Sequence, residues 1–189
     1  MASVKFKAAS TRLKMVLEMI KFEHTIFALP FAYMGMMLAA NGMPNLKQIL
    51  WITVAMVGAR SFAMAINRYI DREIDARNPR TKERAIPTGK LTSKYVLIFS
   101  IISLILFFVA TYQLAPLARV VWPAIVLPFI IYSYTKRFTW LNHVVLGICL
   151  GLGPVGAWIA ITNGLSWPVV ILGAAVMLWV AGFDIIYSC

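Results

Sequence analysis

Six long apolar stretches dominate this 189-residue sequence. A helix that crosses a membrane needs about 20 predominantly apolar residues, and the stretches approach or reach that length. They are continuous and do not alternate between polar and apolar residues, so they predict helices rather than the strands of a membrane barrel. We therefore predict an all-α, polytopic transmembrane bundle that forms a single domain over residues 1–189, with spans near residues 25–40, 46–66, 95–115, 117–135, 141–162 and 167–187.

The composition supports this membrane assignment. Hydrophobic residues make up 61% of the chain and charged residues only 13%, whereas soluble domains are about a quarter charged. Such a chain is too apolar for a soluble enzyme or for a disordered protein. The six spans use most of the length, so no separate soluble domain fits between them.

The basic residues lie almost entirely on one side of the predicted spans. Of the 18 Lys and Arg, 15 fall before the first span, between the second and third, or directly after the fourth; two fall on the other side, and Arg60 lies inside the second span. The positive-inside rule places the richer side in the cytoplasm. We therefore expect residues 1–23, the second and fourth loops and the C-terminal residues to face the cytoplasm of a prokaryotic inner membrane. The net charge of +11 is then explained by basic residues that orient the helices in a lipid bilayer. We therefore expect no nucleic-acid partner.

Three polar side chains form a stripe where the second span continues toward the cytoplasm. Asn67, Asp71 and Asp75 stand four residues apart, which places them on one helix face. Two carboxylates and an amide oxygen are ligands that suit Mg²⁺. Arg60 lies on nearly the same stripe but deeper, where a charge is costly and commonly functional. The alternative is a solvated helix extension with charge pairs around Arg72.

Further charged residues lie on the same predicted side of the membrane. Asp184 ends the sixth span there, and Lys136 and Arg137 follow the fourth. The two basic residues either only satisfy the positive-inside rule or contact a diphosphate. Asp184 is either a helix-end carboxylate in water or a third carboxylate of the same site as Asp71 and Asp75.

Several motifs carry a resemblance to a known family. The Asn67-x3-Asp71-x3-Asp75 pattern, with residues 78–81 (NPRT) and 84–89 (RAIPTG) after it, resembles the first aspartate-rich motif of the UbiA superfamily of intramembrane aromatic prenyltransferases. Two further segments are similar to the branch of 4-hydroxybenzoate polyprenyltransferases and their menaquinone-pathway relatives. These are residues 21–30 (KFEHTIFALP) and 132–139 (YSYTKRFT).

The resemblance implies a bundle of nine spans around a central cavity, where two aspartate-rich motifs bind a polyprenyl diphosphate through Mg²⁺. The second motif begins Asp-x2-Tyr, which Asp184 and Tyr187 match, and the chain ends two residues later. We therefore expect a fragment with six of nine spans that is inactive by itself. The implied catalytic residues are Asp71, Asp75 and Asp184, and the implied metal ligands add Asn67 to these three. The implied substrate-binding residues are Arg60, Asn67, Arg72, Lys136, Arg137 and Tyr187.

The implied reaction transfers a polyprenyl group to a small aromatic acid in ubiquinone or menaquinone biosynthesis, with 4-hydroxybenzoate as the expected acceptor. Two alternatives stay open. One is a sister enzyme of the same superfamily with another acceptor, such as a dihydroxynaphthoate. The other is a membrane transporter with a polar cytoplasmic mouth. A CDP-alcohol phosphotransferase is disfavoured because its Asp-Gly-x2-Ala-Arg signature does not occur in the sequence.

Overall fold

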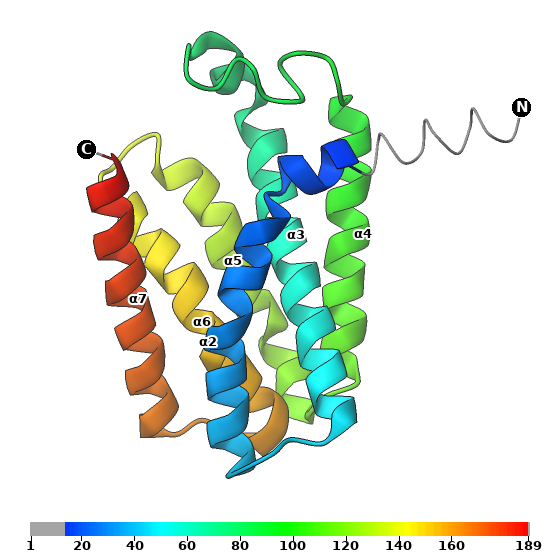
Figure 1. Ribbon diagram of the computed structural model, residues 1–189, viewed down its shortest axis with the longest axis vertical. Helices are drawn as coiled ribbons and strands as arrows, with labels where there is room; N and C mark the ends of the chain where they lie inside the picture. Colours follow the sequence, from blue (N-terminus) through cyan, green and yellow to red (C-terminus); the bar gives the residue numbers. More distant parts are fainter. Residues whose placement is uncertain (1–13, 189) are drawn as a thin grey trace, which may run out of the picture.

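The computed structural model describes residues 14–188, and this part of the chain is built from helices and contains no strand (Figure 1). Residues 14–19 form a short helical segment. The predicted all-α bundle is therefore confirmed. Three of the basic residues in the segment predicted to face the cytoplasm, Lys5, Lys7 and Arg12, lie outside the described range. The long helices, in chain order, are α2 (Phe22–Ala40), α3 (Leu46–Arg77), α4 (Ser93–Tyr112), α5 (Pro116–Thr135), α6 (Asn142–Thr162) and α7 (Trp167–Ser188).

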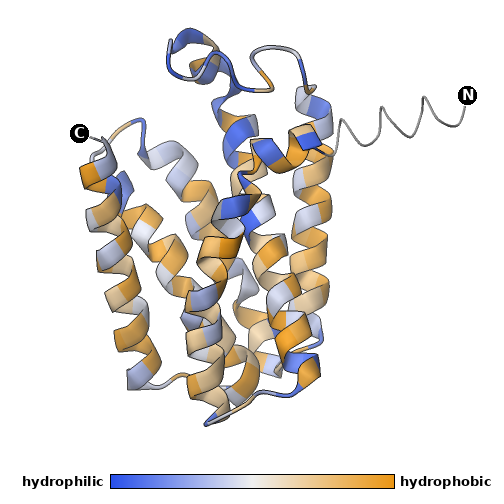
Figure 2. Cartoon of the chain, in the orientation of Figure 1, coloured by the Kyte–Doolittle hydropathy of each residue, from blue (hydrophilic) through white to orange (hydrophobic). Residues whose placement is uncertain are grey.

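Five of these helices, α3 to α7, are long and apolar enough to cross a membrane. The apolar part of α2, Thr25–Ala40, is shorter, and Pro30 lies inside that helix. The number of spans is thus close to the six predicted. Figure 2 shows apolar residues along the helices and polar residues gathered at one end of the bundle, which we call the polar end.

Helix α3 is the longest element and carries the predicted carboxylates. Asn45 caps its N-terminus, because the side chain accepts from the Gln48 backbone N–H at 2.9 Å and the Gln48 side chain accepts from the Asn45 N–H at 3.0 Å. Its 32 residues span about 48 Å, whereas the hydrocarbon core of a bilayer is about 30 Å thick. The helix ends at Arg77, and the extended backbone of the next residue, Asn78, is the conformation that Pro79 imposes on its predecessor.

The helices pack so that the polar end gathers segments far apart in sequence. Helix α3 packs most extensively against α4, and α6 against α7, while α2 lies against α6. Figure 1 shows the loop after α3, the end of α5 and the end of α7 at the same end of the bundle. A buried cluster that includes Val16, Ile20, Leu91 and Val96 fixes this loop to α4 and the N-terminal segment, so charged residues of the loop have a defined position.

Candidate active site

Asp71 lies at the centre of a charged cluster at the polar end. Its side chain is only 2% exposed, and both of its oxygens accept from residues that follow α5. Lys136 Nζ donates to Asp71 Oδ2, and Arg137 Nη2 lies 3.4 Å from Asp71 Oδ1 and donates to the Ile70 carbonyl at 3.1 Å. A buried carboxylate is stable only when it is paired and hydrogen-bonded, so these cations allow Asp71 to be ionised inside the protein.

Asp75 has its own cationic partner from the loop after α3. Arg84 Nη1 donates to both carboxylate oxygens, at 2.7 and 2.8 Å, and the Thr81 hydroxyl donates to the Asp75 carbonyl at 3.0 Å. The Asp75 side chain is 8% exposed. The loop therefore covers Asp75 and compensates its charge. Arg84 belongs to a motif that is recognisable in the sequence, but the pairing of Arg84 with Asp75 was not predicted.

Asn67 completes the stripe one turn before Asp71. One orientation of its amide satisfies every neighbour: Oδ1 accepts from Ser133 Oγ at 3.1 Å and from Lys136 Nζ at 3.0 Å, and Nδ2 donates to Asp71 Oδ2 at 3.3 Å. Ser133 is fully buried. Asn67 thus joins α3 to α5 and helps to fix the positions of both Lys136 and Asp71.

The arginine that approaches both carboxylates is Arg68, while Arg72 is the one that the family resemblance implies as a substrate-binding residue. Arg68 is within electrostatic range of Asp71 and Asp75, because spacings of three and seven residues lie on one helix face. Arg72 instead stacks on the Tyr69 ring at 4.7 Å and donates to Glu73 at 3.2 Å. The spacing of Arg68 would have identified it from the sequence.

The cluster has more positive than negative groups. Arg68, Arg84, Lys136 and Arg137 surround two carboxylates. Burial lowers the pKa of Lys136 below its ordinary 10.5, although its hydrogen bond to Asp71 opposes that shift. A cation whose burial is costly gains when an anion arrives, so the cluster favours a further negatively charged group such as phosphate.

Asp184 lies at the same end of the bundle but in a separate pair. His143 Nδ1, at the start of α6, lies 2.7 Å from Asp184 Oδ2. The Tyr132 hydroxyl is within electrostatic range of both Asp71 and Asp184. Tyr187 is 72% exposed and stacks on Phe183 with ring centroids 6.1 Å apart, which places its ring outside this charged cluster.

The oxygen groups of the stripe fit a Mg²⁺ ion that is bound together with a phosphate. Asp71, Asp75 and the Asn67 amide supply hard oxygen donors from consecutive turns of α3, and Mg²⁺ commonly uses one or two carboxylates plus substrate phosphates. No group of three or more His, Cys, Asp or Glu residues within residues 14–188 is gathered closely enough to hold a metal ion alone. Asn67, Asp71 and Asp75 therefore lie together on α3, while Asp184 lies at the same end of the bundle, where His143 contacts one of its two carboxylate oxygens.

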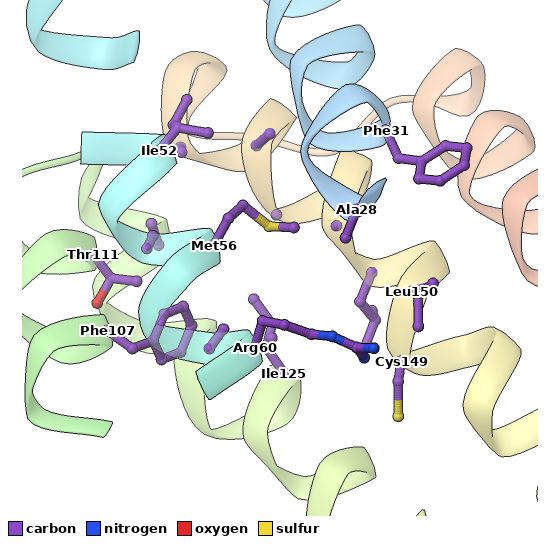
Figure 3. A pocket seen from close by; sticks show the side chains of 18 of the residues that line it. Ala28, Phe31, Ile52, Met56, Arg60, Phe107, Thr111, Ile125, Cys149 and Leu150 are labelled. Atoms are coloured by element: carbon purple, nitrogen blue, oxygen red, sulfur yellow. The ribbon is translucent and has the colours of Figure 1, made fainter. Parts of the chain in front are cut away.

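An apolar pocket opens between the helices, and one of the residues that line it is Arg60, seven residues before Asn67 on α3. It has an empty volume of about 860 Å³, which includes space open to solvent, and lining from α2 to α6, including Phe31, Met56, Phe107 and Ile125. Figure 3 shows the Arg60 side chain crossing the pocket from α3 toward α6. Arg60 Nε is buried and has no hydrogen-bond partner within the described part of the chain. The pocket thus combines apolar walls with one unsatisfied cationic donor.

Sequence comparison identifies the family. The profile of the UbiA prenyltransferase family matches residues 28–189. The chain belongs to the UbiA prenyltransferase family. It is 32% identical over 155 residues to 4-hydroxybenzoate octaprenyltransferase from Vibrio vulnificus strain CMCP6, covering 82% of this chain and 54% of the relative. It is 34% identical over 149 residues to protoheme IX farnesyltransferase from Tropheryma whipplei strain Twist, covering 76% of this chain and 49% of the relative. This chain therefore spans about half the length of these relatives.

Solved UbiA structures have the same fold. The apo structure of a UbiA homologue from Aeropyrum pernix K1 is 34% identical, with a TM-score of 0.80 over 88% of this chain and 63% of the homologue. A UbiA homologue from Archaeoglobus fulgidus bound to DMAPP and Mg²⁺ is 16% identical, with a TM-score of 0.69 over 89% of this chain and 60% of that one. Members of the UbiA family are prenyltransferases and integral membrane proteins, and five helices of this chain are long and apolar enough to cross a membrane.

Proposed function

We propose that this UbiA chain carries the donor site of a prenyltransferase that moves a polyprenyl group from its diphosphate to a small aromatic acid, with 4-hydroxybenzoate as the acceptor. The observation that carries the proposal is the position of the charged cluster. Two buried carboxylates of α3, Asp71 and Asp75, are surrounded by four cations, and Arg60 of the same helix lines an apolar pocket between the helices. A prenyl diphosphate has the matching parts, an anionic head and an apolar tail.

The cluster residues would hold the diphosphate head. Lys136 and Arg137 would donate to its oxygens, and Arg84, with its planar guanidinium, would do the same from the loop. Asp71, Asp75, Asn67 and Asp184 would hold Mg²⁺, which when bound neutralises the diphosphate and makes it a better leaving group. Solved UbiA homologues bound to prenyl diphosphates and Mg²⁺ support this proposal.

The chemistry then depends on electrostatics and position. The bond between the first prenyl carbon and the diphosphate oxygen breaks, and its electron pair leaves with the diphosphate, whose charge the cluster cations stabilise. The electron-rich ring carbon ortho to the acceptor hydroxyl attacks the allylic cation, and the ring then loses a proton. The apolar walls of the pocket would keep water from the cation.

Arg60 supports an acceptor that carries a carboxylate. Its Nε is buried without a hydrogen-bond partner among the described residues, in an otherwise apolar pocket, and a carboxylate forms strong charge-assisted hydrogen bonds with a guanidinium. The relatives named 4-hydroxybenzoate octaprenyltransferase favour 4-hydroxybenzoate. A haem acceptor is the second candidate, since relatives named protoheme IX farnesyltransferase match with a similar identity, and a dihydroxynaphthoate is a third. We also propose that the polar end faces the cytoplasm, because the basic residues concentrate there.

An acceptor panel tests the proposal on the complete gene product in native membranes. Radiolabelled polyprenyl diphosphate is supplied with 4-hydroxybenzoate, 1,4-dihydroxy-2-naphthoate or haem B, with Mg²⁺ or with EDTA. We expect labelled 4-hydroxybenzoate in Mg²⁺ only, its loss in a D71N/D75N double variant, and its retention in E73Q, since Glu73 is an exposed carboxylate on the same helix. Product with haem alone would favour the second candidate. No product with any acceptor, together with Mg²⁺-independent solute flux into proteoliposomes, would favour a transporter.

A further inference from the structure

The contact between His143 and Asp184 joins two helices at the polar end of the bundle. His143 is the second residue of α6, and Asp184 lies in the last turns of α7. The His143 Nδ1 atom is 2.7 Å from Asp184 Oδ2, and the side chains are 18% and 29% exposed. An ionised carboxylate only accepts hydrogen bonds, so the ring nitrogen is the donor. The contact uses one oxygen of Asp184.

Close packing of α6 and α7 sets this contact. A Cβ atom on Gly147 would lie 2.3 Å from the Met177 carbonyl, and one on Gly151 would lie 2.5 Å from the Gly173 carbonyl. The two helices are antiparallel, so four residues back along α6 correspond to four residues forward along α7. Continuing this register one turn places His143 opposite Ala181, and Asp184 lies three residues beyond, on the same face of α7. The glycines therefore fix His143 within reach of Asp184.

We propose that His143 is a positioning residue for Asp184, holding the carboxylate in the orientation that the bound metal and diphosphate require. This inference rests on the proposed function. A hydrogen bond from a second residue commonly orients a carboxylate ligand, and its loss typically costs roughly 10- to 100-fold in metal affinity. His143 restrains Oδ2 and leaves the direction of Oδ1 defined. Without it, Asp184 at the end of a helix would sample several rotamers, and each metal-binding event would have to order it.

The alternative is that His143 only ties α6 to α7. Two substitutions separate the roles. H143N keeps a donor, because the Asn amide nitrogen occupies the place of the imidazole Nδ1, whereas H143L fills similar space without a donor. A merely structural residue would lower thermal stability when replaced and leave metal affinity unchanged in the folded fraction.

The experiment measures Mn²⁺ binding by electron paramagnetic resonance on the complete gene product in detergent. Farnesyl thiolodiphosphate, a donor analogue that resists transfer, is present throughout. We expect the Mn²⁺ dissociation constant of H143L to rise roughly 10- to 100-fold, that of H143N to stay near the unsubstituted value, and both melting temperatures to change little. Prenyl transfer should show the same order, with the Mg²⁺ requirement raised and the acceptor KM unchanged.

Each failure has its own meaning. If the unsubstituted protein binds Mn²⁺ with the analogue and H143L binds it equally well, the positioning role is wrong while the proposed function stands. If H143N loses as much affinity as H143L, the hydrogen bond is not the cause and the inference is again overturned. If the unsubstituted protein neither binds Mn²⁺ nor transfers a prenyl group, the proposed function itself fails.

Discussion

Lys136, directly after α5, donates to the carboxylate of Asp71 on α3, although the two residues are 65 positions apart in the sequence. The same lysine donates to the Asn67 amide oxygen at 3.0 Å when that amide is oriented to satisfy its neighbours. Lys136 thus connects Asn67 and Asp71, two of the predicted metal ligands on α3, to the segment after α5. Because Asp71 is buried and Lys136 is partly exposed, Lys136 is the group of this pair that faces an incoming anion.

Replacing Lys136 by Met should reduce prenyl transfer by roughly 10²-fold, the usual loss when one donor to a developing negative charge is removed. The donor KM should rise and the acceptor KM should stay constant, because the lysine contacts the diphosphate side of the site. Steady-state kinetics with labelled donor measure both values. K82M is the matched control, since Lys82 is exposed in the loop after α3. Equal activity of K136M and K82M would refute a role for Lys136 in donor binding.

Arg84 should hold the loop over Asp75. Replacing Arg84 by Gln removes the donor to both oxygens of a buried carboxylate, and an unsatisfied buried acceptor costs about 1–3 kcal/mol. Hydrogen exchange of residues 78–92 should therefore become faster by a factor of about 5 to 150. R80Q is the control, because Arg80 is an exposed residue of the same loop. Similar exchange in the two variants would show that the apolar cluster alone holds the loop.

Arg60 should set the affinity for an acceptor carboxylate. Hydrogen bonds to charged groups contribute about 1.5–3 kcal/mol, so R60M should raise the KM for 4-hydroxybenzoate by about 10- to 100-fold while leaving the donor KM near its original value. Thermal stability should stay constant or rise, since Met removes a buried charge whose Nε has no hydrogen-bond partner within the described part of the chain. A uniform loss with every acceptor, including one that lacks a carboxylate, would mean that Arg60 acts on the donor or on the fold.

The sequence predicted what depends on local patterns and missed what depends on tertiary contacts. Hydropathy and length identify the helices because each must satisfy its backbone and cover itself with apolar groups in lipid. The four-residue spacing of Asn67, Asp71 and Asp75 identifies their common face for the same local reason. The contacts of Arg72 could not be predicted in this way. Its long side chain lies next to the stripe and could reach either the carboxylates or a neighbouring aromatic ring, and the tertiary structure decides between them.

The partners of two carboxylates could not be obtained from the sequence. Arg84 reaches Asp75 because the loop folds back over the end of α3, and His143 reaches Asp184 because glycine contacts set the register of α6 and α7. Both arrangements follow from packing between segments rather than from any spacing in the chain.

Gly147 should be intolerant of a side chain. Its added Cβ would lie 2.3 Å from the Met177 carbonyl, whereas a Cβ on Gly182 of α7 would meet nothing within 4 Å. G147A should therefore destabilise the protein by about 1–3 kcal/mol through overpacking, and G182A should be neutral or slightly stabilising, because Ala favours a helix more than Gly does. Unfolding midpoints in sodium dodecyl sulfate, read by circular dichroism, compare the two. If G147A is as stable as G182A, α6 and α7 can separate at no cost, and the register that brings His143 to Asp184 is not fixed by Gly147.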